Sequence, residues 1–353
     1  MTDSNSQKQQ VKDNRIAVQS ARDTTINQGI SSDQMREIME CLADQLPRYA
    51  AIASSIVSER LQEFETRIIE RFANDPNADR EAFGDPDFQY LLIEAQKAHA
   101  RKGDQDAVEN LGDLLVERSK SLANTRKALA LNRAIETTSL LTDEEISAIS
   151  MAFALRMVDF NGVIDAPTLG GLLNFICESF LEGTPTNQNS YLYLESLGCG
   201  KLSMGEIGLL DLLARTYPQG VLKRKDVSAI SEEIGSDLVQ FVVSAGLVEV
   251  DTNGDLYSGR DQEQLIKSIR DGGFDVEEER GIRLFQLASG ERPTEDELRI
   301  SLHPHCPMID GLFTRWNGSA IKKLDLSSVG IAIGYVSIKR TMKFKGDIDH
   351  WIN

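Results

Sequence analysis

The segment DVSAISEEIGSDLVQFVVSAGLVEVDTNGDLY (226–257) contains the clearest structural signals in the chain. Two short amphipathic runs are separated by a glycine, and apolar residues then lead to Asn253-Gly254, the dipeptide most typical of a two-residue β-hairpin turn. Another amphipathic run, 204–217, comes before them. Helices followed by a hairpin give the element order of a winged helix, so we predict a winged-helix-like module over 187–260.

The charge of this module argues against DNA binding. Residues 203–258 hold four Lys and Arg against nine Asp and Glu, and the helix expected to enter a groove, 236–245, contains no Lys or Arg. Affinity for nucleic acid comes largely from cations that displace counterions from phosphates. We therefore predict that this face of the module binds protein.

The whole chain is acidic. It has 353 residues, a formal net charge of −17 and 41% hydrophobic residues, enough for two or three domains with ordinary cores. The sequence contains no apolar segment of the kind that forms a signal peptide or a membrane span. Its four cysteines lack a paired spacing, which is typical of reduced cytosolic thiols. We predict a cytoplasmic protein whose partners are mainly proteins.

Residues 1–30 are predicted to be a disordered polar tail followed by two very short strands. Ile16 and Val18, and later Ile26, alternate with polar neighbours as strand residues do. An isolated two-stranded hairpin is only marginally stable in water. We therefore expect these strands to pair with copies of themselves from other subunits.

A long helix is predicted to follow. Apolar residues, among them Ile38 and Leu42, recur at spacings of three and four as far as Phe72. Pro47 is expected to kink or break this helix, because a proline removes one helical hydrogen bond and collides with the preceding turn. Two interpretations remain open: a self-association stalk, or two core helices of a bundle.

The stretch 31–186 is predicted to be a helical bundle. Helix stops such as Gly103 and a capping box of Thr142 with Glu145 divide it into segments. The loop 182–190, rich in Thr, Asn, Gln and Pro, is the expected domain boundary.

The C-terminal part, 261–353, is predicted to be a small α+β domain. Ser327 is expected to cap a helix that is apolar on most sides and therefore buried. Strands are predicted over 321–326 and 344–352. The expected fold class is mainly α with minor β.

His303, His305 and Cys306 form the most distinctive local cluster of chemically active side chains. Zinc is one interpretation, although the intervening prolines make ligation by such close neighbours awkward. A second is thiol chemistry, since a helix start stabilises a cysteine thiolate. The third is a proline-stiffened loop that positions a helix. On balance we predict no catalytic residue, no metal site, no cofactor and no small-molecule substrate.

Basic side chains gather near the C-terminus. Residues 301–353 carry seven Lys and Arg against four Asp. Four of these cations lie close together in the sequence: Lys339, Arg340, Lys343 and Lys345. They are possible contacts for a nucleic-acid backbone or an anionic membrane surface, or else the solvated C-terminal end of a helix, where cations are favoured.

Both ends of the chain show a resemblance. Residues 14–32, with short alternating strands before a helix start, and residues 326–334 with Trp351-Ile352 resemble the opening and ending of an uncharacterised group of bacterial, mostly helical proteins; the join at 190–205 is similar too. The resemblance implies a role in bacterial conflict, including anti-phage defence, and assigns no catalytic residue.

These observations together predict a non-enzymatic, oligomeric cytoplasmic protein that recognises or recruits another protein. The first alternative is nucleic-acid or membrane-surface binding through the basic C-terminal segment. The second is a thiol or metal enzyme centred on Cys306.

Overall fold

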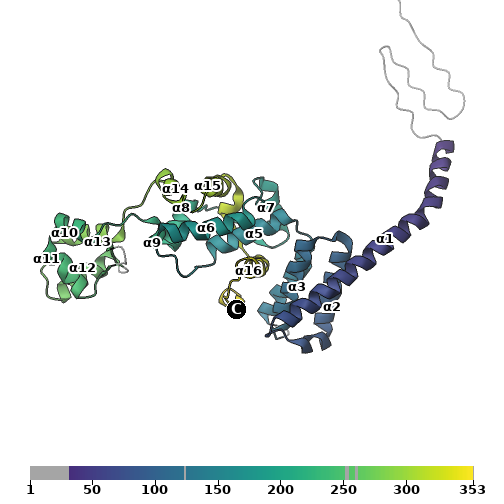
Figure 1. The fold of residues 1–353 in the computed structure, drawn as a ribbon, viewed down its shortest axis with the longest axis horizontal. Coiled ribbons are helices and arrows are strands. Elements are labelled where there is room, and N and C mark those ends of the chain that lie inside the picture. Colours follow the sequence, from purple (N-terminus) through teal and green to yellow (C-terminus); the bar gives the residue numbers. More distant parts are fainter. Residues whose placement is uncertain (1–31, 123–124, 251–253, 259–260, 353) are drawn as a thin grey trace, which may run out of the picture. The chain divides into compact units, whose positions relative to one another are not determined.

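The computed structural model describes residues 32–122, 125–250, 254–258 and 261–352. Helices dominate them, and the strands form two small antiparallel pairs (Figure 1). The predicted mainly helical class is therefore confirmed. The predicted N-terminal strands with Ile16, Val18 and Ile26 lie outside the described residues, as do the side chains of Ile38 and Leu42.

The longest element is α1, Ser32–Asn74, with 43 residues and Pro47 inside it. The proline does not end the helix, but Figure 1 shows that the helix changes direction in its N-terminal part, which contains Pro47. This is the expected effect of one lost hydrogen bond. Residues up to Glu59 and residues from Arg60 onward form separate compact units.

The second unit begins with the last turns of α1, followed by η1 (Arg80–Gly84), α2 (Pro86–Lys102), α3 (Gln105–Ser119) and α4 (Arg126–Thr138). Phe72 and Phe83 pack with ring centroids 4.9 Å apart, and Phe83 and Phe88 with centroids 5.3 Å apart. The predicted stop at Gly103 is confirmed, since this residue ends α2 in the left-handed conformation.

Helices α5 (Asp143–Arg156) and α16 (Ser328–Met342) form the centre of the larger core. The predicted capping box begins α5, where the Thr142 N–H donates to Glu145 Oε2 at 2.9 Å. Ser327 caps α16 as predicted, and every residue from 329 to 338 is buried. A Cβ at Gly334 would lie 2.6 Å from Cβ of Phe153, so a glycine is needed for this close packing.

The C-terminal strand predicted over 344–352 is wrong. The chain there contains only a short 3-10 turn, η3 (Ile348–His350), capped by Asp347. Trp351 donates from Nε1 to the carbonyl oxygen of Met157 at 2.8 Å and packs on Phe153. This segment is therefore held by side-chain contacts with the core in place of strand pairing.

Two strands far apart in the sequence close the larger core. β1 (Gly200–Leu202) pairs antiparallel with β4 (Leu324–Leu326). Only the second half of the strand predicted over 321–326 forms, because η2 (Ala320–Lys323) takes the first half.

The larger core also contains α6, α7, α8, α9, α14 and α15. Their bounds are Ala166–Phe180, Gln188–Ser196, Leu209–Thr216, Pro218–Val221, Glu295–Leu302 and Ile309–Gly318.

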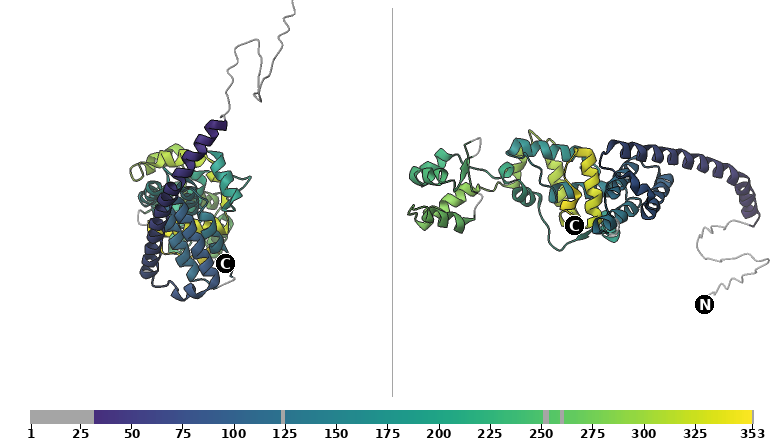
Figure 2. Two further views of the ribbon diagram at one scale, coloured as in Figure 1. Left: turned by 90° about the vertical axis from the view of Figure 1, so that its right-hand side faces the viewer. Right: turned by 90° about the horizontal axis from the view of Figure 1, so that it is seen from below.

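A smaller core is formed by α10 (Val227–Ile234), α11 (Ser236–Ser244), α12 (Gln262–Asp271), α13 (Glu278–Ser289) and the hairpin strands. The strands are β2 (Glu249–Val250) and β3 (Leu256–Tyr257), as the sequence predicts. Figure 2 shows these four helices gathered into one group.

The helix expected to open the winged-helix-like module does not join this smaller core. Leu209 and Leu213 of α8 are fully buried in the larger core instead. The larger core runs through residues 64–221 and resumes at 298–352. The predicted boundaries at 186/187 and 260/261 therefore do not coincide with the limits of the two cores.

Candidate functional site

A charged cleft of about 330 Å³ lies where the last turns of α1 meet α3 and α16. Its charged lining residues are Arg67, Glu70, Arg71, Asp75, Glu109, Asp113, Glu117, Lys339 and Arg340. Cations and carboxylates thus come from three helices that are widely separated in the sequence.

Helix α3 supplies three carboxylates on one face. Glu109, Asp113 and Glu117 are spaced by four residues, which places them one above another on a helix. Arg71 of α1 forms an ion pair with Glu109, and its second terminal nitrogen lies 3.0 Å from Asp113 Oδ1. The end of α1 is thereby joined to α3.

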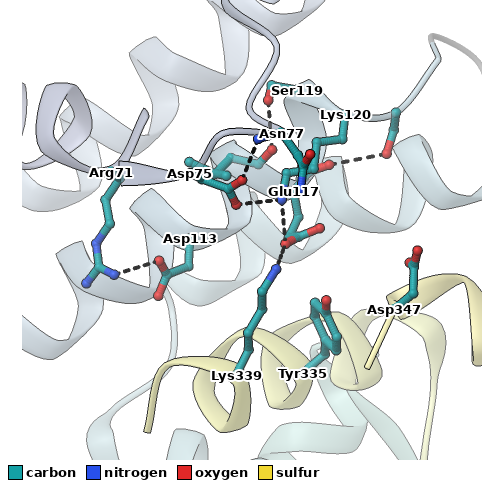
Figure 3. A network of polar contacts seen from close by, with 12 residues as sticks. Arg71, Asp75, Asn77, Asp113, Glu117, Ser119, Lys120, Tyr335, Lys339 and Asp347 are labelled. Atoms are coloured by element: carbon teal, nitrogen blue, oxygen red, sulfur yellow. Dashed lines mark hydrogen bonds and ion pairs between the residues drawn. The ribbon is translucent and has the colours of Figure 1, made fainter. Parts of the chain in front are cut away.

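Helix α16 supplies two cations to the same face. Lys339 points toward α3 and forms an ion pair with Glu117 (Figure 3). Arg340 NH1 lies 3.7 Å from Asp113 Oδ2. Lys120 extends the network, with Nζ 3.0 Å from Glu117 Oε1 and 2.7 Å from Asp75 Oδ2.

The pKa values of two carboxylates of this cleft are shifted in opposite directions. Burial raises the pKa of Asp113 from 3.8 to about 6, because the loss of water outweighs the attraction of Arg71 and Arg340. Burial also acts to raise the pKa of Asp75, but the hydrogen bonds from Lys120 and the Asn77 backbone, with the charges of Lys120 and Lys339, outweigh it and lower the pKa of Asp75. The charge of Asp113 is therefore sensitive to pH near 6.

The arrangement is suited to holding helices together. Each of the two α16 cations has a carboxylate of α3 beside it, and Arg71 contacts two carboxylates of the same helix. These contacts tie α16, close to the C-terminus, to helices near the start of the second unit. We interpret the cleft as an ion-pair network that positions α16.

The structure separates the four basic residues proposed as anion contacts. Lys339 and Arg340 are partly buried and lie in the ion-pair network, whereas Lys343 and Lys345 are exposed beyond the end of α16. Sequence reasoning missed the acidic partners of the first two. The spacing of four between the carboxylates of α3 was the signal that could have found them.

The His-Cys cluster is divided between core and surface. Cys306 is fully buried and its thiol lies beside that of Cys177, whereas His303 and His305 are exposed. The hydrogen bond with Cys306 and burial both raise the pKa of the Cys177 thiol. Within the described ranges, no three His, Cys, Asp or Glu residues are grouped as metal ligands would be. The loop interpretation fits this placement best.

An exposed apolar stripe is the clearest surface feature of the first unit. Large apolar residues in the first part of α1 expose between 38% and 60% of their surface: Met35, Met39, Leu46, Tyr49, Ile52, Ile56 and Val57. Further along the same helix, Phe64, Ile68 and Phe72 are buried in the core of the second unit. One helix therefore carries apolar side chains that are packed at its C-terminal end and exposed at its N-terminal end.

Comparison with known proteins identifies one family. A family model described as “:-like” matches residues 29–352, so the chain belongs to that family, which is uncharacterised. No curated protein and no solved structure matches the chain. In the ranges that the structure describes, every helix is too short or too polar to cross a lipid bilayer.

Proposed function

We propose that the protein is a non-enzymatic homo-oligomer that recognises or recruits another protein. The observation that carries this proposal is the exposed apolar stripe of α1. A contiguous run of large apolar side chains facing water is typical of an interaction surface. Within the described part of a single chain, these side chains, from Met35 to Val57, are in contact with water.

A second copy of the chain is the occupant that best fits the stripe. Met35, Leu42, Tyr49 and Ile56 are each seven residues apart, the repeat with which helices pair as coiled coils. The opposite face is polar, with Asp33, Arg36, Glu37 and Glu40 all exposed. Identical helices would thus bury the apolar face and keep the charges in water.

The charge of α11 supports a polypeptide partner. This helix contains no Lys or Arg, and its Asp237 forms an ion pair with Arg280 of α13. DNA binding would require cations on the face that meets the phosphates. The alternative of an anion contact near the C-terminus is weakened, because Lys339 and Arg340 form ion pairs with carboxylates of α3 that are at most 19% exposed.

The proposal includes a cytoplasmic location and a role in bacterial anti-phage defence. The location is supported by the scattered cysteines, and the role by the resemblance of the two chain ends to an uncharacterised group of bacterial, mostly helical proteins that are suspected of conflict roles.

Light scattering of the full chain over a range of dilutions tests the proposal. We expect an average mass that corresponds to at least two subunits. The mass should fall toward one subunit when the protein is diluted below the dissociation constant of the oligomer. A mass of one subunit at every concentration would contradict self-association. Binding of duplex DNA that weakens steeply with salt and is lost when Lys343 and Lys345 become Gln would favour the alternative.

A further inference from the structure

A basic groove lies beside the smaller core, apart from the charged cleft described above. It has a volume of about 610 Å³ and is formed by the segment before α10 and the end of α13. Four cations line it, Lys223, Arg224, Lys225 and Arg283, together with Glu291 and the half-buried ring of Phe285. The groove thus combines positive charge with apolar surface.

Backbone pairing holds the cationic segment in place. Lys223 and Glu291 exchange two backbone hydrogen bonds, of 2.9 and 2.8 Å, and the carbonyl oxygen of Lys225 accepts from the Leu256 N–H at 3.2 Å. The guanidinium of Arg224 lies over the ring of Tyr257, 4.9 Å from its centroid. These contacts fix the backbone that carries the cations and the guanidinium of Arg224 before any ligand arrives, which reduces the entropy lost on binding.

Carboxylates of the chain itself already contact these cations. Lys223 Nζ lies 2.6 Å from Glu297 Oε1, Lys225 Nζ 2.9 Å from Glu233 Oε2, and Arg283 Nε 2.7 Å from Glu233 Oε1. The hydrogen bond from Lys223, together with those from Thr294, lowers the pKa of Glu297 to about 2. All of these side chains are at least 32% exposed. Exposed ion pairs contribute little, so an incoming carboxylate can replace them.

We propose that this groove binds an acidic peptide segment that also carries an apolar side chain. The glutamates or aspartates of the peptide would replace Glu297 and Glu233, and its apolar side chain would lie against Phe285. This inference rests on the proposed function and names the class of partner that the protein recognises.

The surrounding charge favours a peptide over nucleic acid. Residues 223–291 carry eight Lys and Arg against fifteen Asp and Glu. A duplex would bring its phosphates within a Debye length of these acidic residues, whereas a short peptide can engage the groove alone. The groove therefore suits a compact anionic segment.

Fluorescence anisotropy of the full chain with a short labelled peptide of alternating glutamate and leucine tests the inference. We expect saturable binding that weakens at least about tenfold in the double variant Lys225→Glu, Arg283→Glu, because two charge contacts are reversed. The matched control is Lys267→Glu, Arg270→Glu, which makes the same charge change at exposed positions of α12 outside the groove. The control should stay within about twofold of the unchanged protein.

Three results would overturn the inference: no binding of the peptide, equal weakening in both double variants, or tighter binding of a DNA duplex with the same dependence on Lys225 and Arg283. The subunit mass, measured on the same samples, separates this inference from the proposed function. An oligomer that does not bind the peptide contradicts only the groove, whereas a monomer contradicts the proposed assembly whether or not the peptide binds.

Discussion

Replacing Asp113 by Asn is expected to stabilise the folded protein at neutral pH. Folding raises the pKa of this carboxyl from 3.8 to about 6, so the folded state favours the protonated form. The carboxyl therefore contributes its full stability below about pH 4 and loses that contribution as the pH rises through about 6. A rise of this size corresponds to ~3 kcal/mol between the two limits. Asn is neutral at every pH and can still accept a hydrogen bond from Arg71.

Urea unfolding at pH 4 and at pH 7.5, at one protein concentration, measures the effect. We expect the Asp113→Asn variant to be more stable than the unchanged protein by about 1–3 kcal/mol at pH 7.5, with a much smaller difference at pH 4. Asp75→Asn is the matched control, because contacts including Lys120 lower the pKa of Asp75. The pH dependence therefore has the opposite sign: the stability that the Asp75 carboxylate contributes is present above its unfolded pKa and is lost as the pH falls. Loss of stability in Asp113→Asn at pH 7.5 would refute the reasoning and show that the ion pairs outweigh burial.

Two further substitutions, Gly330→Ala and Ser327→Ala, test the packing and the capping of α16. Gly330→Ala places a Cβ against the carbonyl oxygen of Cys199 and should cost about 1–3 kcal/mol in urea unfolding, whereas Gly171→Ala, with no atom within 4 Å of its Cβ in α6, should stabilise by about 0.5–1 kcal/mol. Equal effects of the two would contradict the close approach at α16. Ser327→Ala removes the cap that accepts from the N–H groups of Val329 and Gly330 and should lower the free energy of unfolding by about 1 kcal/mol; an unchanged value would show that the cap is not needed.

Local signals in the sequence predicted the capped ends of several helices. The capping residues Thr142 and Ser327 and the stop at Gly103 act through hydrogen bonds and backbone angles within a few residues, so a single sequence contains the necessary information. The antiparallel pairing of β2 with β3 is predictable for the same reason, because an Asn-Gly dipeptide between two apolar runs favours a hairpin.

Long-range packing could not be predicted in this way. The pairing of β1 with β4 and the burial of α8 in the larger core depend on contacts between residues more than a hundred positions apart. The sequence likewise presents Lys339 and Arg340 as a basic patch, because their partners on α3 are more than two hundred residues earlier. His303, His305 and Cys306 lie within four positions of the sequence, but only the side chain of Cys306 is buried in the core.

Charge insertion into the stripe of α1 tests self-association most directly. Ile52→Glu introduces a carboxylate on the apolar face, and Ala51→Glu introduces the same group at the preceding residue, on the polar face. Both are compatible with a helix. In sedimentation equilibrium of the full chain we expect Ile52→Glu to shift the protein to single subunits and Ala51→Glu to keep the mass of the unchanged oligomer. An unchanged mass for Ile52→Glu, or dissociation of both variants alike, would contradict assembly through this face.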